Sequence, residues 1–226
     1  MNPLFIGTAA RRLFGLYEPA AALPGKPRAA VLCYPWGMEY IYAHRTMRQL
    51  ASRLSAAGFH TLRFDYFGTG DSSGEADQAD LVGSNSDVEA AMEALRDIAG
   101  ASKVVLIGLR VGANIAVSVA ARHESEVEAL VLWDPIVSGE QYVETLPQGS
   151  DVSDRVLREI RSIDLSTSLE GIPKRSMILV TERLPSHGQL GMPVEFVPAA
   201  CPWVEEITLS GALPVPAMKR IEEWLR

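Results

Sequence analysis

The stretch K-V-V-L-I-G-L-R-V-G-A-N-I-A-V-S-V-A-A-R, residues 103–122, decides the fold that this sequence predicts. Val104–Ile107 is an apolar run typical of a buried strand, and the Ala- and Val-rich residues after Gly112 are typical of a helix. The joint between them, Gly108–Gly112, reads G-L-R-V-G. Its glycines indicate a sharp turn in which a side chain at either flank would collide with the neighbouring strand or helix. The stretch therefore predicts a strand–turn–helix unit with Arg110 at its apex.

Strand and helix patterns alternate along the rest of the chain. Strands are expected at 4–8, 13–17, 29–34, 59–64, 127–133, 176–181 and 194–197, and helices at 42–57, 86–99 and 216–226. This alternation predicts an α/β fold, a mostly parallel sheet with helices on both faces and a hairpin of the first two strands at one edge. We expect one domain over residues 1–226, with the polar segment 136–173 as a small lid or cap that carries two or three short helices.

Composition and charge exclude several classes of protein. The 226 residues carry a net charge of −7, whereas a nucleic-acid binder would normally present a basic face. Cys33 and Cys201 are too few for a disulfide framework and lack metal-ligand spacing, and Gly68, Gly70 and Gly74 do not have the dinucleotide-binding spacing. We therefore expect no metal and no cofactor. No apolar run is long enough to span a membrane and the first residues lack a signal-peptide pattern, so a cytoplasmic protein is expected.

Two further motifs join the turn at Gly108–Gly112 in a consistent order. They are Y-P-W-G at Tyr34–Gly37, directly after a predicted strand, and D-Y-F-G-T-G-D-S at Asp65–Ser72. Together the three resemble the α/β-hydrolase superfamily, especially its serine aminopeptidase/lysophospholipase-like branch. In that family they correspond to the H-G oxyanion loop, to D-x-x-G-x-G-x-S and to the G-x-S-x-G nucleophile elbow. The resemblance implies the α/β-hydrolase fold.

The G-L-R-x-G-A sequence around Arg110 is also similar to hydrolase-like proteins linked to exosortase systems and to some biosynthetic gene clusters.

The resemblance implies a Ser, Asp/Glu, His triad in that chain order, and this sequence departs from it. Arg110 occupies the place of the serine, and its guanidinium is a permanent cation that cannot attack a carbonyl. Asp134 ends the strand after the elbow and is the first candidate for the acid, with Glu182 as the runner-up. No histidine lies at 198–214, where the base is expected, and His187 precedes the last predicted strand. We therefore predict that a conventional charge-relay triad is absent.

Two roles are open for Arg110. It could bind an anion, such as a substrate carboxylate or a developing oxyanion, next to the amides at the start of the helix. It could instead form an internal salt bridge, for which Glu39 on the facing loop and Asp134 are the obvious partners.

The candidate catalytic residues and substrate contacts all lie near the ends of predicted strands or after the oxyanion-loop position. Acid–base help is assigned to Glu39, Asp134 or His187. Trp36 and Tyr40 are expected to form an aromatic wall of a pocket or to pack beneath the lid. The remaining candidate substrate contacts are Gly37, His44, Arg45, Leu109 and Val111.

Three functions remain open from the sequence. The first is an atypical enzyme that acts on an acyl, ester or thioester substrate through Arg110 and the oxyanion-loop amides. The second is a non-catalytic pseudo-hydrolase that binds a small acyl or carboxylate-bearing molecule, or serves a biosynthetic enzyme as an accessory partner. The third, ranked lowest, is a serine esterase or thioesterase with a relocated nucleophile. A homodimer is also left open.

Overall fold

The computed structural model describes residues 1–22, 25–146, 152–200, 203 and 212–226. Its sheet has eight strands in the order β1-β2-β4-β3-β5-β6-β7-β8. The bounds are β1 Asn2–Thr8, β2 Arg11–Glu18, β3 Arg28–Cys33, β4 Phe59–Phe64, β5 Val104–Leu109, β6 Val127–Trp133, β7 Ser176–Val180 and β8 Val194–Phe196. The pairs β1–β2 and β2–β4 are antiparallel and the others are parallel, which confirms the predicted α/β sheet and its edge hairpin.

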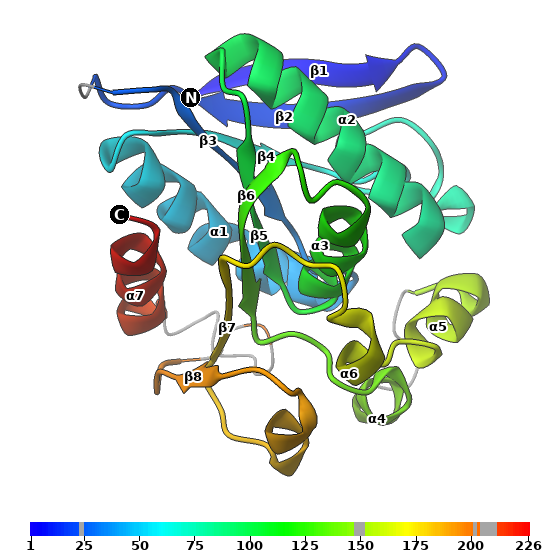
Figure 1. The fold of residues 1–226 in the computed structure, drawn as a ribbon. Helices are drawn as coiled ribbons and strands as arrows, with labels where there is room; N and C mark the ends of the chain where they lie inside the picture. Colours follow the sequence, from blue (N-terminus) through cyan, green and yellow to red (C-terminus); the bar gives the residue numbers. More distant parts are fainter. Residues whose placement is uncertain (23–24, 147–151, 201–202, 204–211) are drawn as a thin grey trace.

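Helices cover both faces of the sheet. Their bounds are α1 Met38–Ala56, α2 Leu81–Ala99, α3 Val111–Arg122, α4 Gly139–Thr145, α5 Asp154–Arg161, α6 Leu165–Ser168 and α7 Val215–Leu225. α1 and α7 lie on one face, and α2 and α3 lie on the other (Figure 1). The short helices α4, α5 and α6 lie together beside one end of the sheet, and they are the short helices expected in the segment 136–173.

Two helices begin earlier than their apolar periodicity predicts. α1 begins at Met38 rather than residue 42, because the chain turns at Gly37 with φ 61° and enters the helix at once. α2 begins at Leu81 rather than residue 86, because the Asp80 side chain accepts a hydrogen bond from the Gly83 N–H and so caps the helix. Leu81 and Val82 are followed by Gly83, Ser84 and Asn85, which interrupt the apolar period, and this is why periodicity alone misplaces the start of the helix.

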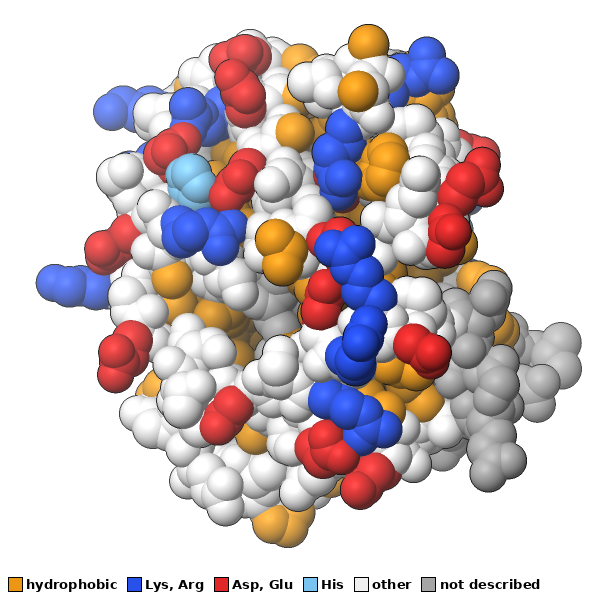
Figure 2. Space-filling view, turned by 90° about the vertical axis from the view of Figure 1, so that its right-hand side faces the viewer, with side chains coloured by type: hydrophobic (Ala, Val, Ile, Leu, Met, Phe, Trp, Pro, Cys, Tyr) orange, Lys and Arg blue, Asp and Glu red, His pale blue; other side chains and the backbone are white. Residues whose placement is uncertain are grey.

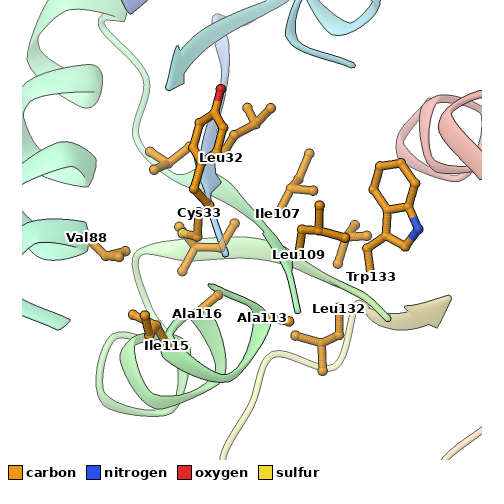
Figure 3. Packing of buried hydrophobic residues seen from close by; sticks show 14 of the residues in the cluster. Leu32, Cys33, Val88, Ile107, Leu109, Ala113, Ile115, Ala116, Leu132 and Trp133 are labelled. Atoms are coloured by element: carbon orange, nitrogen blue, oxygen red, sulfur yellow. The ribbon is translucent and has the colours of Figure 1, made fainter. Parts of the chain in front are cut away.

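The core lies between the central strands and the helices on either side. All six residues of β5 are buried, as expected for a central parallel strand covered on both faces. Leu32 and Cys33 of β3 pack near Ile107 of β5 and near the small side chains of α3 (Figure 3). Burial raises the pKa of the Cys33 thiol to about 12, so this cysteine is an inert core residue. Cys201 lies outside the described residues.

None of the described helices is both long and apolar enough to cross a bilayer.

The charges on one side of the molecule are arranged in pairs. Basic side chains follow one another across this face, with acidic side chains beside them (Figure 2). On α5, Arg155 pairs with Asp80 and Glu159, and Arg161 pairs with Glu140. Carboxylates therefore accompany two of the three arginines of α5, and the third, Arg158, is exposed.

Candidate functional site

The turn between β5 and α3 has the strained geometry of an elbow. Arg110 adopts φ 56° and ψ −128°, a conformation that costs a non-glycine residue about 1–3 kcal/mol. Its N–H donates to the Trp133 carbonyl (3.0 Å), and its carbonyl accepts from the Ala113 N–H (2.9 Å). A Cβ on Gly108 would collide with the backbone of α3, and a Cβ on Gly112 would collide with the carbonyls at the end of β3. The close approach predicted for both glycines is therefore confirmed.

The Arg110 side chain forms an internal ion pair. Its Nε lies 3.1 Å from Glu39 Oε1, and the two side chains are only 17% and 11% exposed. Nη1 donates to the backbone carbonyl of Asp134 (3.3 Å), and the guanidinium carbon lies 5.2 Å from the centre of the Tyr142 ring on α4. The salt bridge expected with Glu39 is present, although Glu39 lies in the first turn of α1 and not on a loop. Asp134 contributes its carbonyl to Arg110 and directs its carboxylate elsewhere.

Burial and pairing act in opposite directions on this cluster. Burial raises the pKa of Glu39, against the lowering effect of Arg110 and the Tyr142 hydroxyl. The Tyr142 hydroxyl lies close enough to affect the pKa of Glu39. Even so, the Glu39 Oε2 atom is buried and has no well-aligned hydrogen bond. Burial disfavours the Arg110 cation, but Glu39 outweighs that effect and the pKa of Arg110 is raised. Arg110 is therefore a cation whose charge is neutralised by a carboxylate of the same protein.

The Asp134 carboxylate is held by Thr181, the residue directly after β7. Its Oδ1 accepts from the Thr181 N–H and its Oδ2 accepts from the Thr181 hydroxyl, each at 2.6 Å. Burial raises the pKa of Asp134 even though both hydrogen bonds from Thr181 lower it. The carboxylate is thus bound to the residue that follows the neighbouring strand. Asp134 itself, directly after β6, adopts a constrained backbone with φ 42°.

A pocket of about 550 Å³ opens beside the cluster. This volume lies within the range of small-molecule sites. The pocket is walled by the segment after β3, by the glycine-rich loop after β4 and by Val152 and Ser153 ahead of α5. The rings on its walls belong to Trp36, Tyr40 and Tyr66.

The structure separates the predicted substrate contacts into two groups. Trp36, Gly37 and Tyr40 line the pocket, in agreement with the aromatic wall expected for Trp36 and Tyr40. The remaining four candidates are absent from its described lining: His44 and Arg45 are exposed on α1, whereas Leu109 and Val111 are buried on either side of Arg110.

His187 lies at a different place. It belongs to the turn at residues 185–189, where its Nδ1 accepts a hydrogen bond from the Leu184 N–H (3.1 Å). It lines a hollow with Arg183, Met192 and Phe196 that shares no described residue with the Arg110 cluster or the aromatic pocket. The structure therefore does not bring His187 together with Glu39, Arg110 or Asp134.

Two backbone amides near the elbow lack an internal acceptor, and of these Trp36 lies on the pocket wall whereas Val111 is fully buried. Among the described contacts, neither the Trp36 N–H nor the Val111 N–H has a hydrogen-bond acceptor. Val111 is the first residue of α3, where an amide has no acceptor within its own helix. Donors of this kind can stabilise a carbonyl oxygen or an anion.

Sequence reasoning missed three residues of this region. Tyr142 lies beside Arg110, Tyr66 stacks on Trp36, and Thr181 donates to Asp134. Of these, only Tyr66 had a signal, since it lies inside the D-x-x-G-x-G stretch. No group of three or more His, Cys, Asp or Glu residues suited to a metal ion occurs in the described part of the chain.

Comparison with solved structures shows the same fold over nearly the whole chain. A ferulic-acid-bound structure of Est1E from Butyrivibrio proteoclasticus matches with a TM-score of 0.73 and 15% identity, covering 98% of this chain and 97% of that one. The esterase Pf2001 of Pyrococcus furiosus matches at 0.70 and 16%, covering 99% and 91%. The enol-lactonase of Burkholderia xenovorans matches at 0.64 and 17%, covering 98% and 99%. At these identities the likeness establishes the fold.

No curated protein matches this sequence. The family model described as serine aminopeptidase, S33, matches residues 25–170, a span that contains the oxyanion-loop position, the glycine-rich loop and the elbow. With more than half of its length matched by that model and with an α/β-hydrolase sheet around the elbow, the chain belongs to the S33 serine aminopeptidase family of α/β-hydrolases.

Proposed function

We propose that this protein binds an acyl, ester or thioester small molecule beside the elbow without hydrolysing it through a serine. The observation that carries the proposal is the Arg110–Glu39 ion pair at the nucleophile position. A guanidinium has no lone pair to offer a carbonyl carbon, and here it is also neutralised by a carboxylate of the same chain.

The pocket next to this ion pair supports binding as the role. Its volume suits a small molecule, and the backbone amide of Trp36 on its wall can donate a hydrogen bond to a carbonyl oxygen. We infer that the segment 136–173 acts as a lid, with residues 147–151 outside the described part. Val152 and Ser153 contribute to the pocket wall, and Tyr142 stands over Arg110. An accessory role beside a biosynthetic enzyme is one use of such a binding protein.

A second candidate is catalysis without a serine. The Trp36 amide favours it, because a donor aimed at a developing oxyanion can lower a barrier on its own. In this case Arg110 adds positive electrostatic potential, and Glu39 or Asp134 would act as the general acid or base. His187, which lines another hollow, would first have to move.

The test combines fluorophosphonate labelling, a panel of p-nitrophenyl acyl esters and thermal shift with non-hydrolysable amide analogues of the same acyl groups. The proteins are the wild type, Arg110→Ala and the double variant Glu39→Gln/Arg110→Gln, which leaves neither charge unpaired. We expect no labelling, no turnover and a rise in melting temperature with at least one analogue. Labelling with turnover would overturn the proposal in favour of a relocated serine. Turnover without labelling, lost in both variants, would establish the second candidate.

A further inference from the structure

Most polar side-chain groups on the pocket walls are already engaged by the protein. In the described lining the exceptions are the indole N–H of Trp36, which is buried without a partner, and the exposed carboxylate of Asp77. The engaged groups are the hydroxyls of two tyrosines, one threonine and one serine. Tyr40 donates to Asp65 Oδ1 (2.6 Å), Tyr66 donates to the Tyr34 carbonyl (3.2 Å), Thr69 donates to the Tyr66 carbonyl (2.7 Å), and Ser153 accepts from the Val156 N–H (3.3 Å). A charged group entering the pocket would lose its water and find few free partners on the walls, which is costly.

The described lining of the pocket carries charge of one sign. Its described lining contains no lysine, arginine or histidine, and its charged member is the exposed carboxylate of Asp77. Asp71 and Glu75, which adjoin the lining residues Gly70 and Ala76, are also exposed. An anion approaching this mouth would be repelled, and a cation would be attracted.

The walls favour flat and apolar groups. The Trp36 and Tyr66 rings are stacked, with centroids 6.1 Å apart and planes at 26°. Met38 and Ile41, which also line the pocket, are 47% and 60% exposed, so apolar surface continues from the interior to the mouth. Aromatic faces of this kind attract cations as well as apolar groups.

We propose that the aromatic pocket receives an uncharged or cationic group carried on an apolar body and rejects an anionic one. The proposal rests on the proposed function only for the assumption that the site binds a small molecule. It narrows the ligand class, because a carboxylate would need Arg110, which lies outside the described lining and is paired with Glu39.

The test uses three ligands with one body, namely phenylethylamine, phenylethanol and phenylpropanoate, titrated into the full chain by calorimetry at low salt. We expect the ammonium and the alcohol to bind at least about 10-fold more tightly than the carboxylate. Asp77→Lys is expected to weaken the ammonium and strengthen the carboxylate by about 3- to 10-fold each, with the alcohol unchanged. Asp97→Lys changes the net charge equally near the end of α2, away from the pocket, and is expected to leave all three unchanged.

Carboxylate binding equal to or tighter than that of the other two would overturn the proposal. So would the absence of binding by all three ligands, or an Asp77→Lys result that matches Asp97→Lys. A different measurement tests the proposed function, because fluorophosphonate labelling would contradict that function whatever the ligand preference of the pocket. A labelled protein that still prefers the ammonium would keep this inference and lose the other.

Discussion

Arg110 combines a strained backbone with a charged side chain. Its φ is 56°, and the side chain that projects from the elbow is a cation. Because that cation is mostly buried, it requires a partner, and Glu39 at the start of α1 supplies one. The two residues are 71 positions apart in sequence, so the pair exists only in the folded chain.

Removal of the Glu39 carboxylate should destabilise the fold. In Glu39→Ala, Arg110 would remain charged in a site that is largely closed to water, so we expect the free energy of unfolding to fall by about 3 kcal/mol. Urea denaturation measures this change. The double variant Glu39→Gln/Arg110→Gln should recover part of the loss, and Arg226→Ala, which removes an exposed pair with Glu222, should cost under about 1 kcal/mol. A loss for Glu39→Ala no larger than for Arg226→Ala would mean that the ion pair contributes little.

At the scale of elements, the β5–α3 unit depends on how closely its backbone approaches β3. Gly112, in the first turn of α3, faces the carbonyls of Cys33 and Tyr34 where β3 ends. The same contact brings the segment after β3, which carries Trp36 and Glu39, to the side of the elbow. The glycines therefore set both the packing and the position of the site.

Gly112→Ala should destabilise the protein by about 1–3 kcal/mol or more, because its methyl group would overlap the backbone of β3, which cannot move without breaking the sheet. The midpoint of thermal unfolding checks this expectation. Gly188→Ala is the matched control, since a methyl group at that exposed position meets nothing within 4 Å, and it should change stability by no more than about 0.5 kcal/mol. Equal effects of the two substitutions would contradict the close approach.

At the scale of the whole molecule, buried carboxyls shape the response to pH. Burial is the largest influence on Glu39, Asp87 and Asp134, and it raises the pKa of each despite their hydrogen bonds. A carboxyl with a raised pKa in the folded state binds its proton more tightly there than in the unfolded chain. Its contribution to stability is therefore fully present below the unfolded pKa and is lost as the pH rises through the folded pKa.

Asp134→Asn isolates one of these contributions, since asparagine tolerates a positive φ and can still accept from the Thr181 N–H. We expect the unfolding free energy of the wild type, relative to this variant, to fall as the pH rises from about 4 to about 8. Urea denaturation of both proteins across that range gives the difference directly. A difference that grows with pH would show that the hydrogen bonds from Thr181 outweigh burial.

The sequence by itself determined the elements and their order. Apolar runs and their periods predicted the strands and the helices, and the glycine motifs placed the elbow and the loop after β4, because these signals are local. The hydrophobic period did not predict the starts of α1 and α2. Gly37 and the Asp80 cap set these starts through backbone geometry, which a hydrophobic period does not contain.

Only the tertiary structure decided the contacts of the site. It selected Glu39 over the Asp134 carboxylate as the partner of Arg110, and it turned that carboxylate toward Thr181. It also added Tyr142 from α4 to the cluster and placed His187 in another hollow. The physical reason is that ion pairs and pocket walls join side chains from distant segments. Their pairing follows from sheet order and backbone direction, which no local pattern specifies.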